Sequence, residues 1–145
     1  MFKRILIPYD GSNFSKKAMD VAIEISKKFG SELWFFTVLD KDIPPRLTKP
    51  VIEDSKKSKS RKSLSSIELE LRNKVLDCKD QGSCADYEII KGSPIGTILR
   101  FAKKKKMDLI IMGSQGLHGI NKIKSLGSVS RAVSEKSECP VLLVH

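Results

Sequence analysis

The sequence predicts an α/β fold in which one parallel sheet is covered by helices on both faces. Five short apolar runs alternate with stretches of helical periodicity, the order from which right-handed crossovers build a parallel sheet. Several runs are continuously apolar rather than alternating, as expected when helices bury both faces of the sheet. The length of 145 residues suits a single hydrophobic core, so we expect one domain over 1–145.

The predicted strands cover, in chain order, 5–7, 33–39, 87–90, 109–112 and 141–144. Between the first two strands, Ser12 is placed to cap the start of a helix and Gly30 to end it in a left-handed turn. The apolar residues of this helix recur at helical spacing and predict its buried stripe. They are Phe14, Ala18, Val21, Ala22, Ile25 and Phe29.

Three further helices follow from the same spacing. Ser93 and Pro94 mark the start of the third helix, as a cap followed by proline in the first turn. The positions that we expect to be buried are Leu64, Ile67, Leu71 and Cys78 in the second helix, Ile95, Ile98, Leu99 and Ala102 in the third, and Leu126, Val129, Ala132 and Val133 in the fourth. Residues 41–62 form a long connection, from much of which three prolines exclude regular structure.

The net charge of +10 raises the question of a nucleic-acid partner. The lysines concentrate in 56–62 and 103–106. The first cluster has the Ser/Lys composition of a solvated surface, and the second closes a helix, where cations complement the helix dipole. No aromatic residue is interleaved with the lysines of 56–62, so base stacking lacks support and we do not expect nucleic-acid binding.

Cysteine and histidine usage points to a reducing compartment without a metal site. Cys78, Cys84 and Cys139 form no C-x-x-C pair, which predicts buried or half-buried thiols rather than a disulfide framework or zinc site. The two histidines, His118 and His145, are too few for a histidine-rich metal site. No stretch approaches the roughly 20 apolar residues of a membrane span, so we expect a cytoplasmic protein.

Polar, glycine-rich segments follow the first and fourth predicted strands, where open α/β sheets bind ligands. They cover 8–12, 113–119 and 127–130. Glycines let backbone N–H groups approach an anion closely, and the helix N-terminus after Gly127 favours negative charge. Ser128 and Ser130 add hydroxyl donors, so these segments predict a phosphate-bearing ligand. The alternative interpretation is that the glycines only make tight turns and that Ser128 only caps the helix.

Asp10 lies in the segment after the first strand. Its carboxylate is placed to accept a hydrogen bond from a ribose hydroxyl, as acidic residues do in other nucleotide folds. The alternative is an Asp-Gly turn residue that also caps the first helix.

The motifs together resemble the universal stress protein family over essentially the whole chain. They are Pro8-x-Asp10-Gly11-Ser12, Gly113-x-x-Gly116, Gly127-Ser128-Val129-Ser130 and the closing Cys139-Pro140-Val141-Leu142-Leu143-Val144. The resemblance implies a three-layer Rossmann-like (adenine nucleotide alpha hydrolase-like) fold with strand order 3-2-1-4-5. It also implies a homodimer through the last strand, Val141–Val144, an unpaired sheet edge that an identical strand would cover.

In the ATP-binding branch of that family, one set of residues borders the adenosine and another surrounds the phosphates, often with Mg²⁺ on the phosphate oxygens. The resemblance implies that Pro8, Asp10 and Val38 here form the first set, and that Gly113, Gly116, Gly127, Ser128 and Ser130 form the second. Tyr9, Met112 and Val129 complete the predicted binding residues.

The spacing of the glycines departs from the usual ATP-binding pattern. That pattern has glycine, two residues, glycine, nine residues, then glycine with Ser or Thr. Here ten residues, 117–126, separate Gly116 from Gly127, and the frame from Gly116 to Gly119 leaves only seven. One extra residue in a surface loop is thermodynamically mild, although it shifts Lys122 or Lys124 relative to the phosphates.

The expected function is a non-catalytic, ATP-binding regulatory protein of the stress response. No G-x-x-x-x-G-K-[ST], G-x-G-x-x-G or G-x-S-x-G motif occurs, which argues against a P-loop ATPase, a dinucleotide enzyme and a serine hydrolase. No orienting partner can be named for His118, so we predict no catalytic residue. Two alternatives stay open: a nucleotide-free interaction module that docks an acidic partner or nucleic acid through 56–62, and a weak ATPase.

Overall fold

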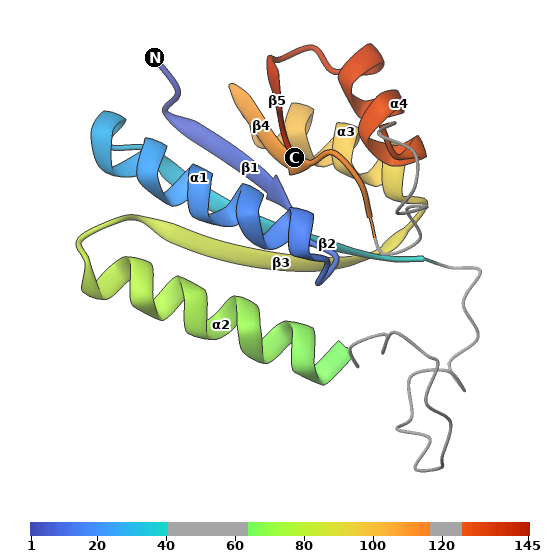
Figure 1. Ribbon diagram of the computed structural model, residues 1–145. Coiled ribbons are helices and arrows are strands. Elements are labelled where there is room, and N and C mark those ends of the chain that lie inside the picture. Colours follow the sequence, from blue (N-terminus) through green and yellow to red (C-terminus); the bar gives the residue numbers. More distant parts are fainter. Residues whose placement is uncertain (41–63, 117–125) are drawn as a thin grey trace, which may run out of the picture.

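The computed structural model describes residues 1–40, 64–116 and 126–145, which form a three-layer α/β fold (Figure 1). The five parallel strands are β1 (Arg4–Pro8), β2 (Glu32–Asp40), β3 (Ala85–Gly92), β4 (Leu109–Gly113) and β5 (Val141–Val144). Their order across the sheet is β3-β2-β1-β4-β5, which confirms the predicted order. The topology therefore switches direction between β1 and β4, where the carboxyl ends of strands leave room for a ligand.

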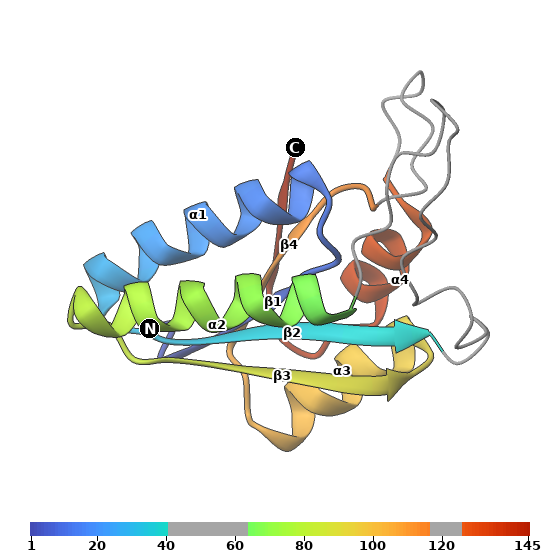
Figure 2. The same cartoon turned by 90° about the horizontal axis from the view of Figure 1, so that it is seen from below.

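The helices of the described residues are α1 (Asn13–Phe29), α2 (Leu64–Asp80), α3 (Pro94–Lys104) and α4 (Ser128–Lys136). Figure 2 shows α1 and α2 on one side of β2 and β3 and α3 on the other. The side chains of neighbouring strand residues point to opposite faces of the sheet. Ile5 packs in the apolar cluster that contains Leu71 of α2, and Leu6 packs in the cluster that contains Val133 of α4. The prediction of helices on both faces is confirmed.

The ends of α1 follow the sequence prediction, and its buried face follows it only at Ala18 and Ala22. Ser12 accepts a hydrogen bond from the Ser15 N–H, and Gly30 ends the helix at a φ of 68°. Phe29 is 54% exposed, with its ring edge-on to Phe2, so its predicted burial is wrong. Phe14, Val21 and Ile25 are half-buried. The buried residues of α1 are Ser15, Ala18, Met19, Ala22 and Ser26.

The start of α3 carries a second correction. Ser93 occupies the cap position with Pro94 at the first helical position, but its side chain makes no capping hydrogen bond. Ile98 is buried as predicted, while Leu99 and Ile95 are half-buried. The buried residues of α3 are Thr97, Ile98, Phe101 and Ala102.

The remaining predictions of burial hold in part: Val133 is buried as expected, but Leu64 of α2 and Leu126, Val129 and Ala132 of the predicted fourth helix are half-buried. Ile67, Leu71 and Cys78 of α2 are buried as expected, together with Val75, which the pattern had not singled out. Cys139 is half-buried, but Cys84 is exposed because it lies in the turn before β3.

No helix in the described part of the chain combines the length and the apolar composition that a membrane span requires. The prolines of 41–62, the lysines of 56–62, His118 and the spacer 117–125 lie outside the described residues.

Candidate functional site

Three of the predicted segments meet at the carboxyl end of the sheet, and we call 8–12, 113–116 and 126–130 together the carboxyl-end site. A Cβ placed on Gly116 would lie only 2.9 Å from Asp10 Oδ2, so the segments after β1 and β4 are in contact. The Gly127 N–H donates to the Ser114 carbonyl at 2.8 Å, which joins the start of α4 to the segment after β4. The fold therefore brings together residues that are more than 100 positions apart in the chain.

Gly113 is fixed by packing. A Cβ at this position would lie 2.7 Å from Phe14 Cβ, 2.8 Å from the Phe14 carbonyl carbon and 2.9 Å from the Ser15 nitrogen, and real Cβ atoms do not approach so closely. The first turn of α1 thus lies directly against the end of β4. The sequence assigned Gly113 to phosphate contact, and the structure adds that α1 could not pack here against any larger residue.

Gly127 has more room than Gly113. A Cβ here would meet Gln115 Cα at 3.4 Å, the Ser114 oxygen at 3.5 Å and the Gly116 nitrogen at 3.6 Å, all ordinary contacts. A single methyl group therefore fits, whereas a longer side chain would extend over the backbone of 114–116. Gly127 is the cap residue of α4, so Ser128 is the first residue of the helix rather than its cap, and its side chain is exposed.

Ser130 is buried, at 3% exposure, and its hydroxyl donates to the Gly113 carbonyl at 2.8 Å. Its hydrogen is therefore used to hold α4 against the end of β4, and only its acceptor lone pairs remain. The prediction that Ser130 donates to a phosphate requires this hydrogen bond to be exchanged.

Ser114 is a residue that the sequence analysis did not single out. It is 1% exposed, and its hydroxyl has no hydrogen-bond partner among the described residues, which is uncommon for a buried polar group. Both of its backbone groups are paired, the N–H with Val144 and the carbonyl with Gly127. The only feature of the sequence that could have pointed to Ser114 as a site residue is its position next to Gly113.

Asp10 makes the turn that the alternative interpretation expected. Its Oδ1 accepts the Ser12 N–H at 2.9 Å, while Ser12 rather than Asp10 caps α1. Its Oδ2 lies beside Gly116. The first turns of α1 and α4 contain no acidic residue, so the positive ends of both helix dipoles are uncompensated by carboxylates within the helices. The Asp10 carboxylate already lies at the start of α1, so it is the start of α4 that favours a further negatively charged group at the carboxyl-end site.

Tyr9 is turned away from the layer that contains Val38. Its ring is 4% exposed in the cluster under α1 and α2, and its hydroxyl donates to the Glu70 carboxylate. Burial, then the hydrogen bond from its hydroxyl to Glu70, raises the pKa of Tyr9 above its ordinary value. The Tyr9 N–H donates to the Phe36 carbonyl, and its carbonyl accepts from Thr37 Oγ1 at 2.7 Å. Tyr9 therefore anchors the segment after β1 to β2 and α2.

Val38, Val129 and Met112 belong to the opposite layer. Val38 and Val129 are half-buried against the cluster of α3 and α4. Met112 is 5% exposed within the same cluster, so its side chain supports the floor of the site. Pro8 ends β1 and is half-buried opposite Phe36.

The sheet order and the glycine-rich segments at its switch point define a Rossmann-like α/β protein. The model of the universal stress protein family matches residues 1–145, so the chain belongs to that family. The chain is 34% identical over 148 residues to a universal stress protein of Methanocaldococcus jannaschii, MJ0531, covering 99% of this chain and 82% of that protein. It is 33% identical to YxiE of Bacillus subtilis over the full length of both chains.

Solved structures agree with this assignment. The M. jannaschii protein MJ0577 superposes with a TM-score of 0.78 at 26% identity, over 99% of this chain and 96% of that one. A universal stress protein solved with cAMP gives a TM-score of 0.69 at 24% identity, over 99% and 97%. An Archaeoglobus fulgidus protein with dAMP gives 0.64 at 18% identity over the full length of both chains. An Arabidopsis thaliana protein with AMP gives 0.64 at 18% identity over 98% and 90%. At these three lower identities the likeness establishes the shared fold.

Proposed function

We propose that this chain is a cytoplasmic regulatory protein that binds ATP at the carboxyl-end site and acts through ligand-dependent interaction in the stress response. The observation that carries the proposal is the contact between segments: Gly127 donates to Ser114, and Gly116 lies beside Asp10. Backbone N–H groups, two helix N-termini and one carboxylate then converge where strand order reverses, a combination suited to a phosphate and a ribose. The adenine nucleotides held by proteins of the same fold are consistent with this chemistry.

Under this proposal, different residues of the site contact the ribose and the phosphates. Asp10 would accept a hydrogen bond from a ribose hydroxyl through its carboxylate, whose Oδ2 lies beside Gly116. Gly116 and Ser128 would present backbone N–H groups to the phosphates. Gly127, whose own N–H donates to the Ser114 carbonyl, would leave room for the phosphates by having no side chain. In the described part of the chain, no three His, Cys, Asp or Glu side chains gather to hold a metal. Mg²⁺ would therefore be held chiefly by phosphate oxygens, where it neutralises their charge.

Equilibrium dialysis with ATP and Mg²⁺ tests the proposal. Wild-type protein is expected to bind, and Gly127→Leu to lose binding, because the side chain would cover the backbone of 114–116. Ser134→Leu is the matched control, since it adds the same bulk on the exposed face of the same helix. The proposal fails if wild-type protein binds no nucleotide at millimolar concentration, or if Gly127→Leu binds as well as the control.

A weak ATPase is the second candidate, since a bound triphosphate is open to slow hydrolysis. A single-turnover assay on purified protein separates the two functions. The regulatory proposal expects ATP to be recovered intact after binding, and release of phosphate by wild-type protein but not by Gly127→Leu would favour the ATPase.

We further propose a homodimer through β5. The strand is the last in the sheet, with β4 on one side only, and Leu142 is 39% exposed. An identical strand would pair the free edge and cover this side chain. Light scattering is expected to give a dimer for wild-type protein and a monomer for Leu142→Lys. A wild-type monomer at micromolar concentration would contradict the proposal.

A further inference from the structure

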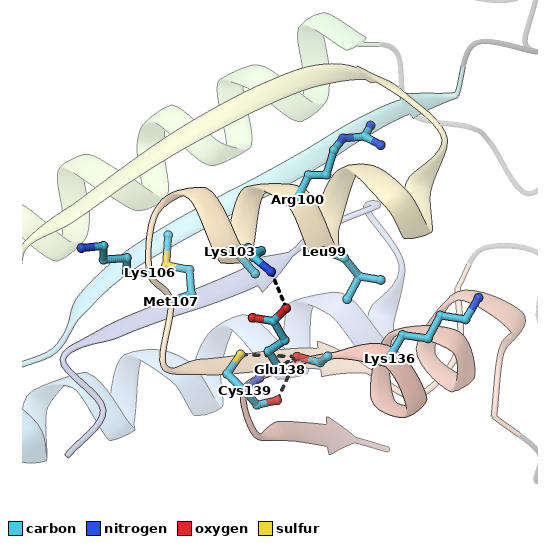
Figure 3. A pocket seen from close by; sticks show the side chains of 10 residues that line it. Leu99, Arg100, Lys103, Lys106, Met107, Lys136, Glu138 and Cys139 are labelled. Atoms are coloured by element: carbon cyan, nitrogen blue, oxygen red, sulfur yellow. Dashed lines mark hydrogen bonds and ion pairs between the residues drawn. The ribbon is translucent and has the colours of Figure 1, made fainter.

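A second candidate binding region lies at the opposite end of the sheet. A cavity of about 450 Å³ opens between the C-terminal half of α3 and the turn that leads from α4 into β5 (Figure 3). Two of its lining residues, Met107 and Cys139, each come two positions before a strand, β4 and β5 respectively. The cavity thus lies at the amino end of these strands, and the five residues of β4 put it roughly 15 Å from the carboxyl-end site.

We call this cavity the basic cavity, because the residues at its rim are mostly cationic. Arg100 and Lys103 come from α3, Lys106 from the turn after it, and Lys136 from the end of α4. Glu138 is the single carboxylate among the lining residues, so the lining carries four positive charges and one negative charge, of which only Lys103 is directed at Glu138 (Figure 3). Long cationic side chains from separate elements are able to bend toward one anionic group, and such a concentration of one sign attracts anions.

The inner surface of the basic cavity is apolar. Ala102 and Met107 are each 6% exposed and belong to the core cluster under α3 and α4, and Leu99 is half-buried against the same cluster. A cavity of a few hundred cubic ångströms with apolar walls and a few charged groups is typical of sites for small organic molecules. A bare inorganic anion would leave these apolar walls unused.

Glu138 shows where an anionic group is held. Its carboxylate reaches back to the Lys103 ammonium at 2.6 Å, across the space between the β5 entry and α3 (Figure 3). Both side chains are largely exposed, at 71% and 73%, and ion pairs of this kind are weak. A ligand with its own anionic head is therefore able to displace Glu138 from Lys103 without a large loss.

We propose that the basic cavity is a binding site for a small amphipathic organic anion, separate from the carboxyl-end site. The carboxylate, sulfonate or phosphate head of the ligand replaces Glu138 at Lys103 and is held by the neighbouring cations. The apolar body lies against Leu99, Ala102 and Met107. The site lets the protein bind a second ligand, independently of the nucleotide.

Fluorescence titration with anilinonaphthalene sulfonate, an aromatic sulfonate, tests the proposal on the full-length protein. The probe is expected to bind with saturation, and the uncharged phenylnaphthylamine to bind more weakly because it lacks the anionic head. An excess of ATP should leave the bound probe in place. Release of the probe by ATP from wild-type protein but not from Gly127→Leu would overturn the proposal, because it would locate the probe at the carboxyl-end site. Release from both proteins would show that ATP itself occupies the basic cavity, and would overturn the independence of the two sites.

Two variants with opposite expected effects strengthen the test. The double variant Arg100→Gln/Lys136→Gln should weaken probe binding about tenfold, since each exposed charge contributes about threefold. Glu138→Gln should tighten it about threefold, because it removes the internal competitor. Lys17→Gln, on the exposed face of α1, is the charge-matched control for each cation lost.

Unchanged thermal unfolding midpoints will show that all these variants are folded. The proposal is overturned if the double variant binds the probe as tightly as Lys17→Gln does. It is also overturned if Glu138→Gln weakens binding. Protection of Cys139 from a thiol reagent by the probe, in a Cys84→Ser background, provides an independent readout at the cavity wall.

Discussion

The two candidate sites, one at each end of the sheet, are formed by different kinds of chemical group. At the carboxyl end, the candidate nucleotide site consists of glycines, small serines and backbone groups, packed so closely that Gly113 touches Phe14 and Ser15. At the amino end, the basic cavity is lined by long cationic side chains that are largely exposed, such as Lys103. A site made of backbone is specified by the fold, whereas one made of long side chains is specified by residue type.

This difference means that the two sites should respond differently to mutation. Changes at the carboxyl end alter packing as well as binding, because the same atoms serve both. Changes at the amino end alter charge and leave packing intact. The predictions below follow this contrast from the largest expected loss of stability to the smallest.

Gly113→Ala is expected to have the largest effect. Its Cβ would overlap the backbone of Phe14 and Ser15, so α1 must move away from β4, at a cost of about 3 kcal/mol. Gly127→Ala is the matched control: its Cβ has ordinary contacts, and the loss should be below about 1 kcal/mol. Urea unfolding measures both, and equal losses in the two variants would contradict the packing argument.

Tyr9→Phe should cost about 2 kcal/mol, because the Glu70 carboxylate loses a hydroxyl donor. Burial and the Glu70 hydrogen bond raise the pKa of Tyr9 in the folded state, so its contribution is complete below the ordinary value of 10.0. It is lost as the pH rises through the higher folded pKa. Urea unfolding at about pH 8 and about pH 11 should therefore show a smaller advantage of wild type over Tyr9→Phe at the higher pH. An advantage that grows with pH would contradict the assignment.

Ser130→Ala is expected to cost about 1 kcal/mol, since the buried Gly113 carbonyl loses the hydroxyl that donates to it. Ser134→Ala removes a comparable hydrogen bond, from Ser134 to the Arg131 carbonyl, on the exposed face of the same helix. Water replaces that bond, so its loss should be smaller. If the two alanine variants lose the same stability in chemical denaturation, the anchoring role of Ser130 is wrong.

Lys103→Gln should have the smallest effect on stability. Its ion pair with Glu138 joins two exposed side chains that water and salt screen. The hydrogen bond to Glu138 raises the pKa of the Lys103 ammonium. Differential scanning calorimetry should find no measurable change in Tm for Lys103→Gln. A clear decrease would show that the amino end, too, is held by its charged side chains.

Local features of the fold were readable from the sequence, and non-local ones were not. The bounds of β5 and the two ends of α1 follow from residues next to one another, so they were predicted correctly. The buried face of α1 was predicted only at Ala18 and Ala22, and the apolar pattern could not reveal that Ser15 and Ser26 are buried as well. Their hydroxyls donate to carbonyls three residues earlier in the chain, which allows a polar residue to be buried among apolar ones.

The candidate site shows the same limit. The sequence indicated which segments follow β1 and β4, but it gave no sign that Gly113 makes room for α1. Nor did it show that the Ser130 hydroxyl is occupied, or that the Tyr9 ring turns toward Glu70. These contacts join elements distant in the chain, and no local pattern encodes them.

Titration with ATP and Mg²⁺ followed by amide NMR compares the two ends of the sheet in one experiment. The account predicts that the largest amide shifts occur at Gly113, Gly116, Gly127 and Ser128. The amide chemical shifts of 103–107 and 136–139, around the basic cavity, should not change. The largest shifts at the basic cavity, or no shift at millimolar ATP, would contradict the assignment of the nucleotide to the carboxyl end.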